Sequence, residues 1–276
     1  MRQMELQNAP IGVFDSGFGG LTVAREIMRQ IPNEKIVYFG DTARVPYGTK
    51  SRATILKYSK QIVRFLRTKE VKAIVVACNT ASALALEDIR RELDIPILGV
   101  IKPGAKIAAH TTQNGKIGII GTEATIQSKI YTHFIQDLNP ELTVIGKACP
   151  LFVPIVEEGT FLNDPILDAI ADRYLEEIKQ QGIDTLILGC THYPLLRSTL
   201  GRLMGESVTL VNPAYETARE LQRLLHKEKL ENTKKQDIEQ MHMFYVSDTP
   251  DRFKQFAASI LPCSAERTIQ INIEEY

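Results

Sequence analysis

Two cysteines in similar surroundings are the residues of this sequence best suited to chemistry. Cys78 closes the short apolar run 75–77, Cys190 closes the run 186–189, and small polar residues follow each cysteine. A lone buried cysteine is usually a small apolar residue of the core. Two cysteines at the same point of two similar segments instead suggest paired thiols, which as thiolates can act as bases or nucleophiles.

Paired thiols suit the inversion of a stereocentre by proton transfer. One thiolate would remove the proton from a Cα atom, and the other thiol would deliver a proton to the opposite face. In the reverse direction the two roles exchange, so two groups of the same kind are appropriate. The ordinary thiol pKa, about 8.5, allows both forms near neutral pH after a modest shift.

The segments around the cysteines predict strands that end at the thiols. Each apolar run is typical of a buried parallel strand, and helical patterns follow over 81–93 and 194–204. The thiols should therefore lie at carboxyl ends of strands, where ligands bind in open α/β sheets. The N-terminus of a following helix would also favour a thiolate.

The order of predicted elements indicates an α/β fold. Strands at Ile11–Phe14, Lys35–Phe39, 75–77 and Ile95–Val100 alternate with helices, which is typical of a parallel sheet covered on both faces. The pattern restarts at Gly115–Thr122, and the offset from residue 11 to 117 nearly equals that from 78 to 190. We therefore predict two similar parallel-sheet α/β domains related by pseudo-twofold symmetry, with the active site in the cleft between them.

The predicted domain boundaries leave the C-terminal tail with the first domain. The strand 244–246 and the helix 250–260 have no counterpart in the repeat, and an unpaired strand needs a sheet edge. We predict a first domain of residues 1–99 plus 212–276 and a second of residues 100–211.

Several local signals predict where helices begin. Thr22 could cap a helix that runs to Ile31, and Asp164-Pro165 predicts the start of a helix that ends near Gln181. Between the strand Thr143–Ala148 and Gly159, the prolines predict a loop.

Composition narrows the class of protein. The 276 residues have a formal net charge of zero, which argues against broad binding to nucleic acid or to anionic membranes. No run approaches the roughly 20 apolar residues of a membrane span, and Met1–Pro10 lacks an apolar signal core. These features predict a cytoplasmic protein whose four cysteines are reduced, with Cys149 structural and Cys263 inert.

Four motifs, taken together in their order and spacing, resemble those of a known protein family. They are Asp15-Ser16-Gly17-x-Gly19-Gly20, Pro46-Tyr47-Gly48, Ala77-Cys78-Asn79-Thr80-Ala81 and Gly189-Cys190-Thr191-His192-Tyr193-Pro194. Together they resemble the glutamate racemases of the cofactor-independent aspartate/glutamate racemase superfamily. The similarity runs from Ile11 to about Glu220, and His192 stands where aspartate racemases tend to have glutamate.

The resemblance implies roles for the matching residues. Cys78 would be the base toward D-glutamate and Cys190 the base toward L-glutamate, with Asp15 and His192 assisting proton transfer beside them. Glu157 resembles a carboxylate that lines the site. The residues implied in substrate binding are Asp15, Ser16, Pro46, Tyr47, Gly48, Asn79, Thr80, Glu157, Thr191 and His192.

The resemblance also implies the wider setting of the reaction. Members of the family use no cofactor and no metal, commonly form homodimers, and supply D-glutamate for peptidoglycan and thus for cell-wall biogenesis and cell shape. Thr122 and Thr125 could hydrogen-bond substrate or cap a helix, and the residues alone leave this open. Taken singly, His192 could instead be a structural histidine and Glu157 a surface carboxylate.

Other classes of function remain as alternatives. Cys78, Cys190 and His192 could supply three zinc ligands, although no C-x-x-C or H-x-x-x-H spacing is present. The same absence of C-x-x-C disfavours a thiol oxidoreductase. A racemase of aspartate or of a hydantoin, and a non-catalytic two-lobed protein that binds an amino acid, are the nearest alternatives. Metal analysis and solvent exchange at Cα would separate them.

Overall fold

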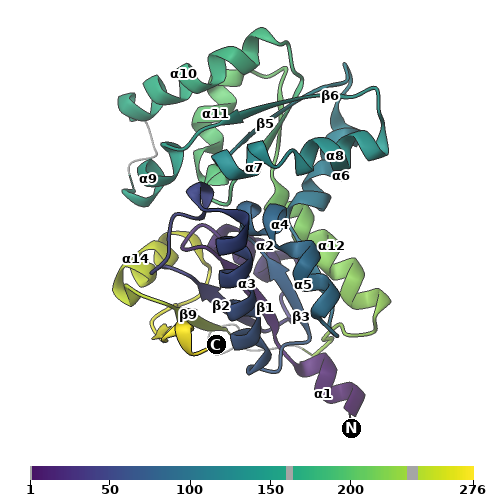
Figure 1. The fold of residues 1–276 in the computed structure, drawn as a ribbon, viewed down its shortest axis with the longest axis vertical. Coiled ribbons are helices and arrows are strands. Elements are labelled where there is room, and N and C mark those ends of the chain that lie inside the picture. Colours follow the sequence, from purple (N-terminus) through teal and green to yellow (C-terminus); the bar gives the residue numbers. More distant parts are fainter. Residues whose placement is uncertain (1, 160–163, 235–241) are drawn as a thin grey trace.

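The computed structural model describes residues 2–159, 164–234 and 242–276, which form two parallel β-sheets flanked by helices (Figure 1). The larger sheet has the strand order β10 (Ile269–Gln270), β9 (Met243–Val246), β2 (Ile36–Gly40), β1 (Ile11–Asp15), β3 (Ala73–Val76), β4 (Ile97–Gly99). The smaller sheet has the order β6 (Thr143–Ala148), β5 (Lys116–Gly121), β7 (Thr185–Gly189), β8 (Thr209–Val211). The predicted α/β class is confirmed.

The two sheets repeat one strand order. In the larger sheet β1 lies between β2 and β3, and β4 lies beyond β3; β5, β6, β7 and β8 have the same arrangement in the smaller sheet. In the larger sheet β9 then pairs with the free edge of β2. The repeat makes β3 and β7 equivalent strands, and each leads into one of the two cysteines.

Helices occupy the connections between the strands. They are α1 (Arg2–Asn8), α2 (Leu21–Gln30), α3 (Arg52–Arg67), α4 (Asn79–Leu84), α5 (Leu86–Glu92), α6 (Ile101–Thr111), α7 (Glu123–Gln127), α8 (Ile130–Leu138), α9 (Phe152–Glu157), α10 (Pro165–Gln180), α11 (Arg197–Met204), α12 (Pro213–Lys227) and α14 (Pro250–Ile260), with short 3₁₀ turns η1 (Tyr47–Thr49), η2 (Tyr193–Leu196) and η3 (Ile273–Glu275).

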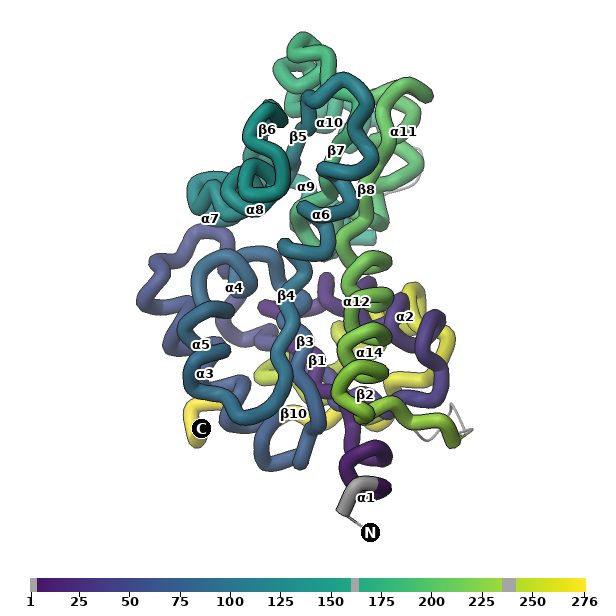
Figure 2. The backbone as a smooth tube through the Cα atoms, turned by 90° about the vertical axis from the view of Figure 1, so that its right-hand side faces the viewer, coloured from purple at the N-terminus to yellow at the C-terminus, as the bar shows by residue number. Residues whose placement is uncertain are grey.

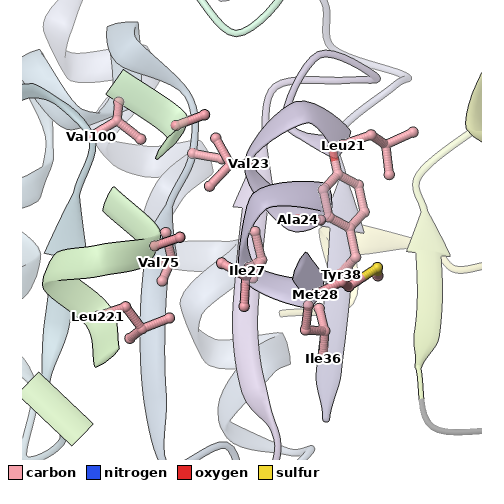
Figure 3. Close-up of a cluster of buried hydrophobic side chains, with 14 of the residues drawn as sticks. Leu21, Val23, Ala24, Ile27, Met28, Ile36, Tyr38, Val75, Val100 and Leu221 are labelled. Carbon is pink, nitrogen blue, oxygen red and sulfur yellow. The ribbon is translucent and has the colours of Figure 1, made fainter. Parts of the chain in front are cut away.

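The core explains why these segments adopt this arrangement. Along α2, buried apolar residues recur every three or four positions, so one face of the helix packs on the sheet. Figure 3 shows side chains from α2, β3 and α12 in one cluster, among them Ile27, Val75 and Leu221, which are all fully buried. Burying one side chain of this size stabilises the fold by roughly 1.5–3 kcal/mol before entropy is counted.

Two crossings connect the halves. The chain passes from β4 through α6 into the smaller sheet, and it returns from β8 into α12, which packs against α2 (Figure 2). One continuous apolar cluster includes Ile11 of the larger sheet and Ile119 of the smaller. We propose that these crossings mark the boundaries between a domain of residues 1–99 plus 212–276 and a domain of residues 100–211.

Some local predictions were wrong. Gly20, not Thr22, is the N-cap of α2, and the Thr22 hydroxyl instead donates to the carbonyl oxygens of Gly19 and Thr191. The predicted loop before Gly159 contains α9, since Pro154 lies in its first turn, where a missing N–H costs nothing. The helix predicted over 81–93 is interrupted at Ala85.

Other elements agree with the predictions made from the sequence. Asp164 caps α10 through the backbone N–H groups of Ile166 and Leu167, and Pro165 begins the helix, as predicted. Within the described ranges, no helix is long and apolar enough to cross a membrane.

Candidate active site

A single cavity of about 380 Å³ lies between the two halves and contains both cysteines. Its size is at the lower end of the roughly 300–1,000 Å³ typical of small-molecule sites. Twelve of the residues predicted from the sequence line it: Ser16, Pro46, Tyr47, Gly48, Cys78, Asn79, Thr80, Thr122, Glu157, Cys190, Thr191 and His192. The remaining two, Asp15 and Thr125, are buried behind its wall.

Cys78 is held by neutral hydrogen-bonding groups. It is the N-cap residue of α4, where its Sγ accepts from the Ala81 N–H at 3.4 Å, and its thiol donates to Ser16 Oγ at 3.6 Å. Strand register explains the second contact, because Phe14 pairs with Val76 and Ser16 therefore lies opposite Cys78. Burial and the Asp15 charge raise the pKa of the Cys78 thiol to about 12, so this group is a thiol at neutral pH.

Asp15 lies at the junction of the two halves. Its carboxylate accepts from the Gly17 N–H at 3.0 Å and from the Thr191 hydroxyl at 3.4 Å. Burial raises the pKa of Asp15, while the nearby His192 charge and these hydrogen bonds oppose the rise. Among the described residues, its hydrogen-bond partners do not include Cys78, so its influence on that thiol is electrostatic.

Cys190 is surrounded by charged groups instead. Its Sγ lies 3.8 Å from His192 Nδ1, and His192 Nε2 lies 3.0 Å from Glu157 Oε1. Burial alone would lower the pKa of His192, but the contacts with Cys190 and Glu157 outweigh it and raise that pKa to about 10. The imidazolium is therefore the favoured form of His192 at neutral pH.

The loop that contains Pro46 closes one side of the cavity. Tyr47 is buried and its hydroxyl donates to Asp41, which also pairs with Arg44 at 2.7 Å. Because the phenol is engaged by Asp41, and the Tyr47 carbonyl accepts from the Lys50 N–H, both groups already have a hydrogen-bond partner within the protein. A Cβ atom on Gly48 would lie 2.8 Å from Thr122 Cβ, so glycine permits the loop to approach the second half.

Polar side chains from both halves meet in the wall of the cavity. Thr80 Oγ1 lies 2.9 Å from Thr122 Oγ1, which lies 2.9 Å from Thr125 Oγ1. Thr122 also caps α7, so capping and a place in the cavity wall coexist. Asn79 Oδ1 accepts from the Tyr131 hydroxyl at 2.8 Å, which leaves the amide N–H groups of Asn79 as donors.

The glycine turn after β1 packs closely on the Cys190 side. A Cβ atom on Gly19 would lie 2.3 Å from Thr191 Oγ1 and 2.5 Å from His192 Nδ1. Only glycine allows this approach, so Gly19 brings the first half against the residues next to Cys190.

Several residues near the site were not singled out from the sequence. Val45, Thr49, Glu123, Pro150 and Val153 also line the cavity. Val45 and Thr49 flank a motif that was recognised, so proximity in sequence could have found them. Pro150 and Val153 had no such signal, because the sequence predicts only a loop between Ala148 and Gly159.

The remaining cysteines lie outside this cavity, and all four are free thiols. Cys149 is buried and Cys263 lies near Met28. Within the part of the chain that the structure describes, no group of three or more His, Cys, Asp or Glu side chains could hold a metal ion.

Known proteins resemble this chain both in sequence and in fold. The Asp/Glu/Hydantoin racemase family pattern matches residues 11–221. The glutamate racemase of Geobacter metallireducens is 48% identical over 265 residues, which cover 96% of this chain and 97% of the relative. That of Oceanobacillus iheyensis is 46% identical over 251 residues, covering 91% and 90%. The crystal structure of glutamate racemase from Francisella tularensis in complex with D-glutamate superposes with a TM-score of 0.90 at 41% identity, covering 98% of this chain and 100% of that one.

Proposed function

The chain belongs to the Asp/Glu/Hydantoin racemase family and is an amino-acid racemase, and on this premise we propose that it interconverts L- and D-glutamate. The observation that carries the proposal is the single cavity shared by Cys78 and Cys190, which come from equivalent strands of the repeat. A purely binding protein would not need paired thiols at this point.

We propose a two-base mechanism without a cofactor. The Cys190 thiolate removes the Cα proton of L-glutamate, and the electron pair of the broken C–H bond delocalises into the substrate carboxylate. The Cys78 thiol then donates its proton to the opposite face of Cα, which gives D-glutamate and leaves a thiolate on Cys78. The reverse reaction begins at Cys78 and ends at Cys190.

The charges around the two cysteines suit these proposed roles. The raised pKa of Cys78 keeps its proton available, and the imidazolium of His192 lies beside Cys190, where it would offset the charge of the thiolate that the mechanism requires. With the thiolate on Cys190 the site is prepared for L-glutamate, and turnover converts it into the form prepared for D-glutamate. Desolvation strengthens a thiolate as a base, because the buried charge lacks hydrating water.

Hydrogen-bond donors around the cavity would hold the substrate. The Asn79 amide and the hydroxyl groups of Thr80 and Thr122 face the cavity from the two halves. Donors fixed in a water-poor site stabilise the charge that develops on a carboxylate during deprotonation. Asp15, Ser16, Pro46, Tyr47, Gly48, Thr125, Glu157, Thr191 and His192 complete the proposed set around the substrate.

The test is solvent exchange with both enantiomers. In D₂O, L-glutamate and D-glutamate should each acquire deuterium at Cα and reach equal amounts of the two enantiomers, because enantiomers have equal free energies. Chiral chromatography and mass spectrometry measure both events. Aspartate and a hydantoin serve as alternative substrates, and faster turnover of either would replace glutamate in the proposal.

We further propose a cytoplasmic homodimer that supplies D-glutamate for peptidoglycan. Both proposed bases must stay reduced, which the cytosol provides. Depletion of the protein in its cell should then be rescued by external D-glutamate, and light scattering should give twice the chain mass.

A further inference from the structure

A cation of the C-terminal helix reaches the Cys190 side of the cavity. Arg252 lies in α14, which follows β9 of the larger sheet, whereas Glu157 ends α9 beside the smaller sheet. Arg252 Nη2 lies 3.5 Å from Glu157 Oε2. The contact therefore joins a segment of the first half to a side chain at the site of the second.

Glu157 connects Arg252 to the groups beside the reacting thiol. Glu157 uses its two oxygens differently, since Oε2 faces Arg252 and Oε1 lies 3.0 Å from His192 Nε2. The other ring nitrogen of His192 lies 3.8 Å from Cys190 Sγ. A carboxylate held at both oxygens has one orientation, and that orientation fixes the imidazole next to the thiol.

The packing of α14 fixes the position of the arginine. Phe253 is fully buried, with its ring centroid 5.6 Å from that of Tyr38. The Arg252 guanidinium lies 5.4 Å from the ring centroid of Phe18, in the turn after β1. Phe256 places its ring centroid 6.4 Å from that of His192. The helix is therefore anchored in the first half and contacts both Glu157 and His192.

We propose that Arg252 is a positioning residue that orients Glu157, and through it His192, for proton transfer at Cys190 and not at Cys78. The inference rests on the proposed two-base reaction and deepens it. It assigns to the C-terminal tail a role in one of the two half-reactions.

The expected effect is moderate, because the Arg252 side chain is 55% exposed and water screens its charge. We expect Arg252→Gln to lower kcat/KM about three- to ten-fold, as for a partly screened ion pair acting through one further residue. The equilibrium constant between enantiomers is one, so kcat/KM must fall equally in both directions. A separate measurement has to show which half-reaction is slowed.

Primary deuterium isotope effects provide that measurement. With Cα-deuterated L-glutamate, the C–D bond breaks at Cys190, so slowing this step in Arg252→Gln should increase the isotope effect on kcat/KM. With Cα-deuterated D-glutamate, the C–D bond breaks at Cys78, and the isotope effect should fall toward one. A variant that merely folds less well would lower the active fraction and leave both isotope effects unchanged.

Two further variants complete the experiment. Lys254→Gln removes a cation from the same helix whose partner is Asp251, so it should keep both wild-type isotope effects. Arg252→Lys retains the charge and should restore the wild-type pattern. Unchanged isotope effects in Arg252→Gln, an equal shift in Lys254→Gln, or a lysine variant that behaves like Arg252→Gln would overturn the proposal. A wild-type protein that does not racemise glutamate would instead overturn the proposed function, and this inference with it.

Discussion

The surroundings of Cys78 and Cys190 differ although the strands that lead into them are equivalent. Cys78 begins a helix and meets a backbone N–H and a serine hydroxyl. Cys190 precedes a 3₁₀ turn and meets a histidine backed by a glutamate. The first environment raises the pKa of the Cys78 thiol, whereas the second places the cation of His192 beside the sulfur of Cys190, so the repeated unit surrounds its two thiols with different charges.

The hydroxyl groups opposite the two thiols show the same divergence. Ser16 lies opposite Cys78 and accepts from it. Gly121 pairs with Gly189, so Thr122 lies opposite Cys190, but its hydroxyl contacts Thr80 and Thr125 instead. The charged pair of His192 and Glu157 takes the place of this hydroxyl beside Cys190. The comparison teaches that the backbone repeat fixes where the thiols lie, and the side chains fix which charged groups lie beside each of them.

The largest expected effect comes from removing either thiol. Cys78→Ala and Cys190→Ala should each lose racemisation at least about 10³-fold, because each removes the acid or the base on one face. The remaining thiol should still exchange one enantiomer: L-glutamate in Cys78→Ala and D-glutamate in Cys190→Ala. Proton NMR in D₂O measures this exchange. Cys263→Ala, outside the cavity, is the control. Racemisation retained in either single variant would remove the two-base assignment.

Adding a methyl group at Gly19 should have the next largest effect, because it disturbs the groups beside Cys190. Because the new Cβ atom would lie 2.5 Å from His192 Nδ1, the histidine or the turn has to move. A displacement of about 1 Å at such a site can cost about 10²-fold in kcat/KM. Steady-state kinetics with Gly19→Ala tests this expectation.

Gly201→Ala is the matched control for Gly19→Ala. Gly201 lies within α11, and its Cβ atom would lie 3.7 Å from Leu210 Cδ1 of β8, an ordinary van der Waals distance. Activity should remain unchanged, and thermal unfolding should show a gain of up to about 1 kcal/mol, because alanine favours helices. Equal activity in the two variants would contradict the close approach at Gly19.

Replacing His192 tests the charged character of the Cys190 side. His192→Asn should lower kcat about 10- to 100-fold, because it removes a charge-assisted hydrogen bond whose free energy corresponds to a rate change of this size. The pH dependence should identify the group. The pKa of His192 is raised to about 10, so the imidazolium is present below that pH and is lost as the pH rises through it.

Wild-type kcat should accordingly fall above about pH 10, and this decrease should be absent in His192→Asn. Cys78 retains its proton over this range, since its pKa is raised to about 12. Identical alkaline behaviour of the two proteins would show that another group controls the decrease.

The smallest effect is expected on the Cys78 side. Ser16→Ala removes a neutral contact of 3.6 Å to sulfur, so kcat should fall less than about five-fold. Initial rates measured up to saturating glutamate give kcat for both Ser16→Ala and His192→Asn. An effect of Ser16→Ala as large as that of His192→Asn would mean that the two thiols do not differ as described.

The sequence predicted more of the strands than of the contacts between elements. The apolar runs gave β3 and β7, and Asp164-Pro165 gave the start of α10, because these features depend on residues near one another in the chain. The cap of α2 was missed, since Thr22 bonds to Thr191 in the other half. The resemblance implied that Asp15 assists proton transfer beside Cys78, which stays a prediction; its charge acts on that thiol, while its hydrogen bonds are made to Gly17 and Thr191.

By itself, the sequence determined the repeated α/β unit and the position of each cysteine at the end of its strand. Alternation of apolar runs and helices, with turn residues between them, is a local property of the chain. Only the tertiary structure decided that both thiols share one cavity and that Cys190 has charged neighbours. Those contacts join residues distant in sequence, such as Glu157 and His192, and burial removes the water that would otherwise screen their charges.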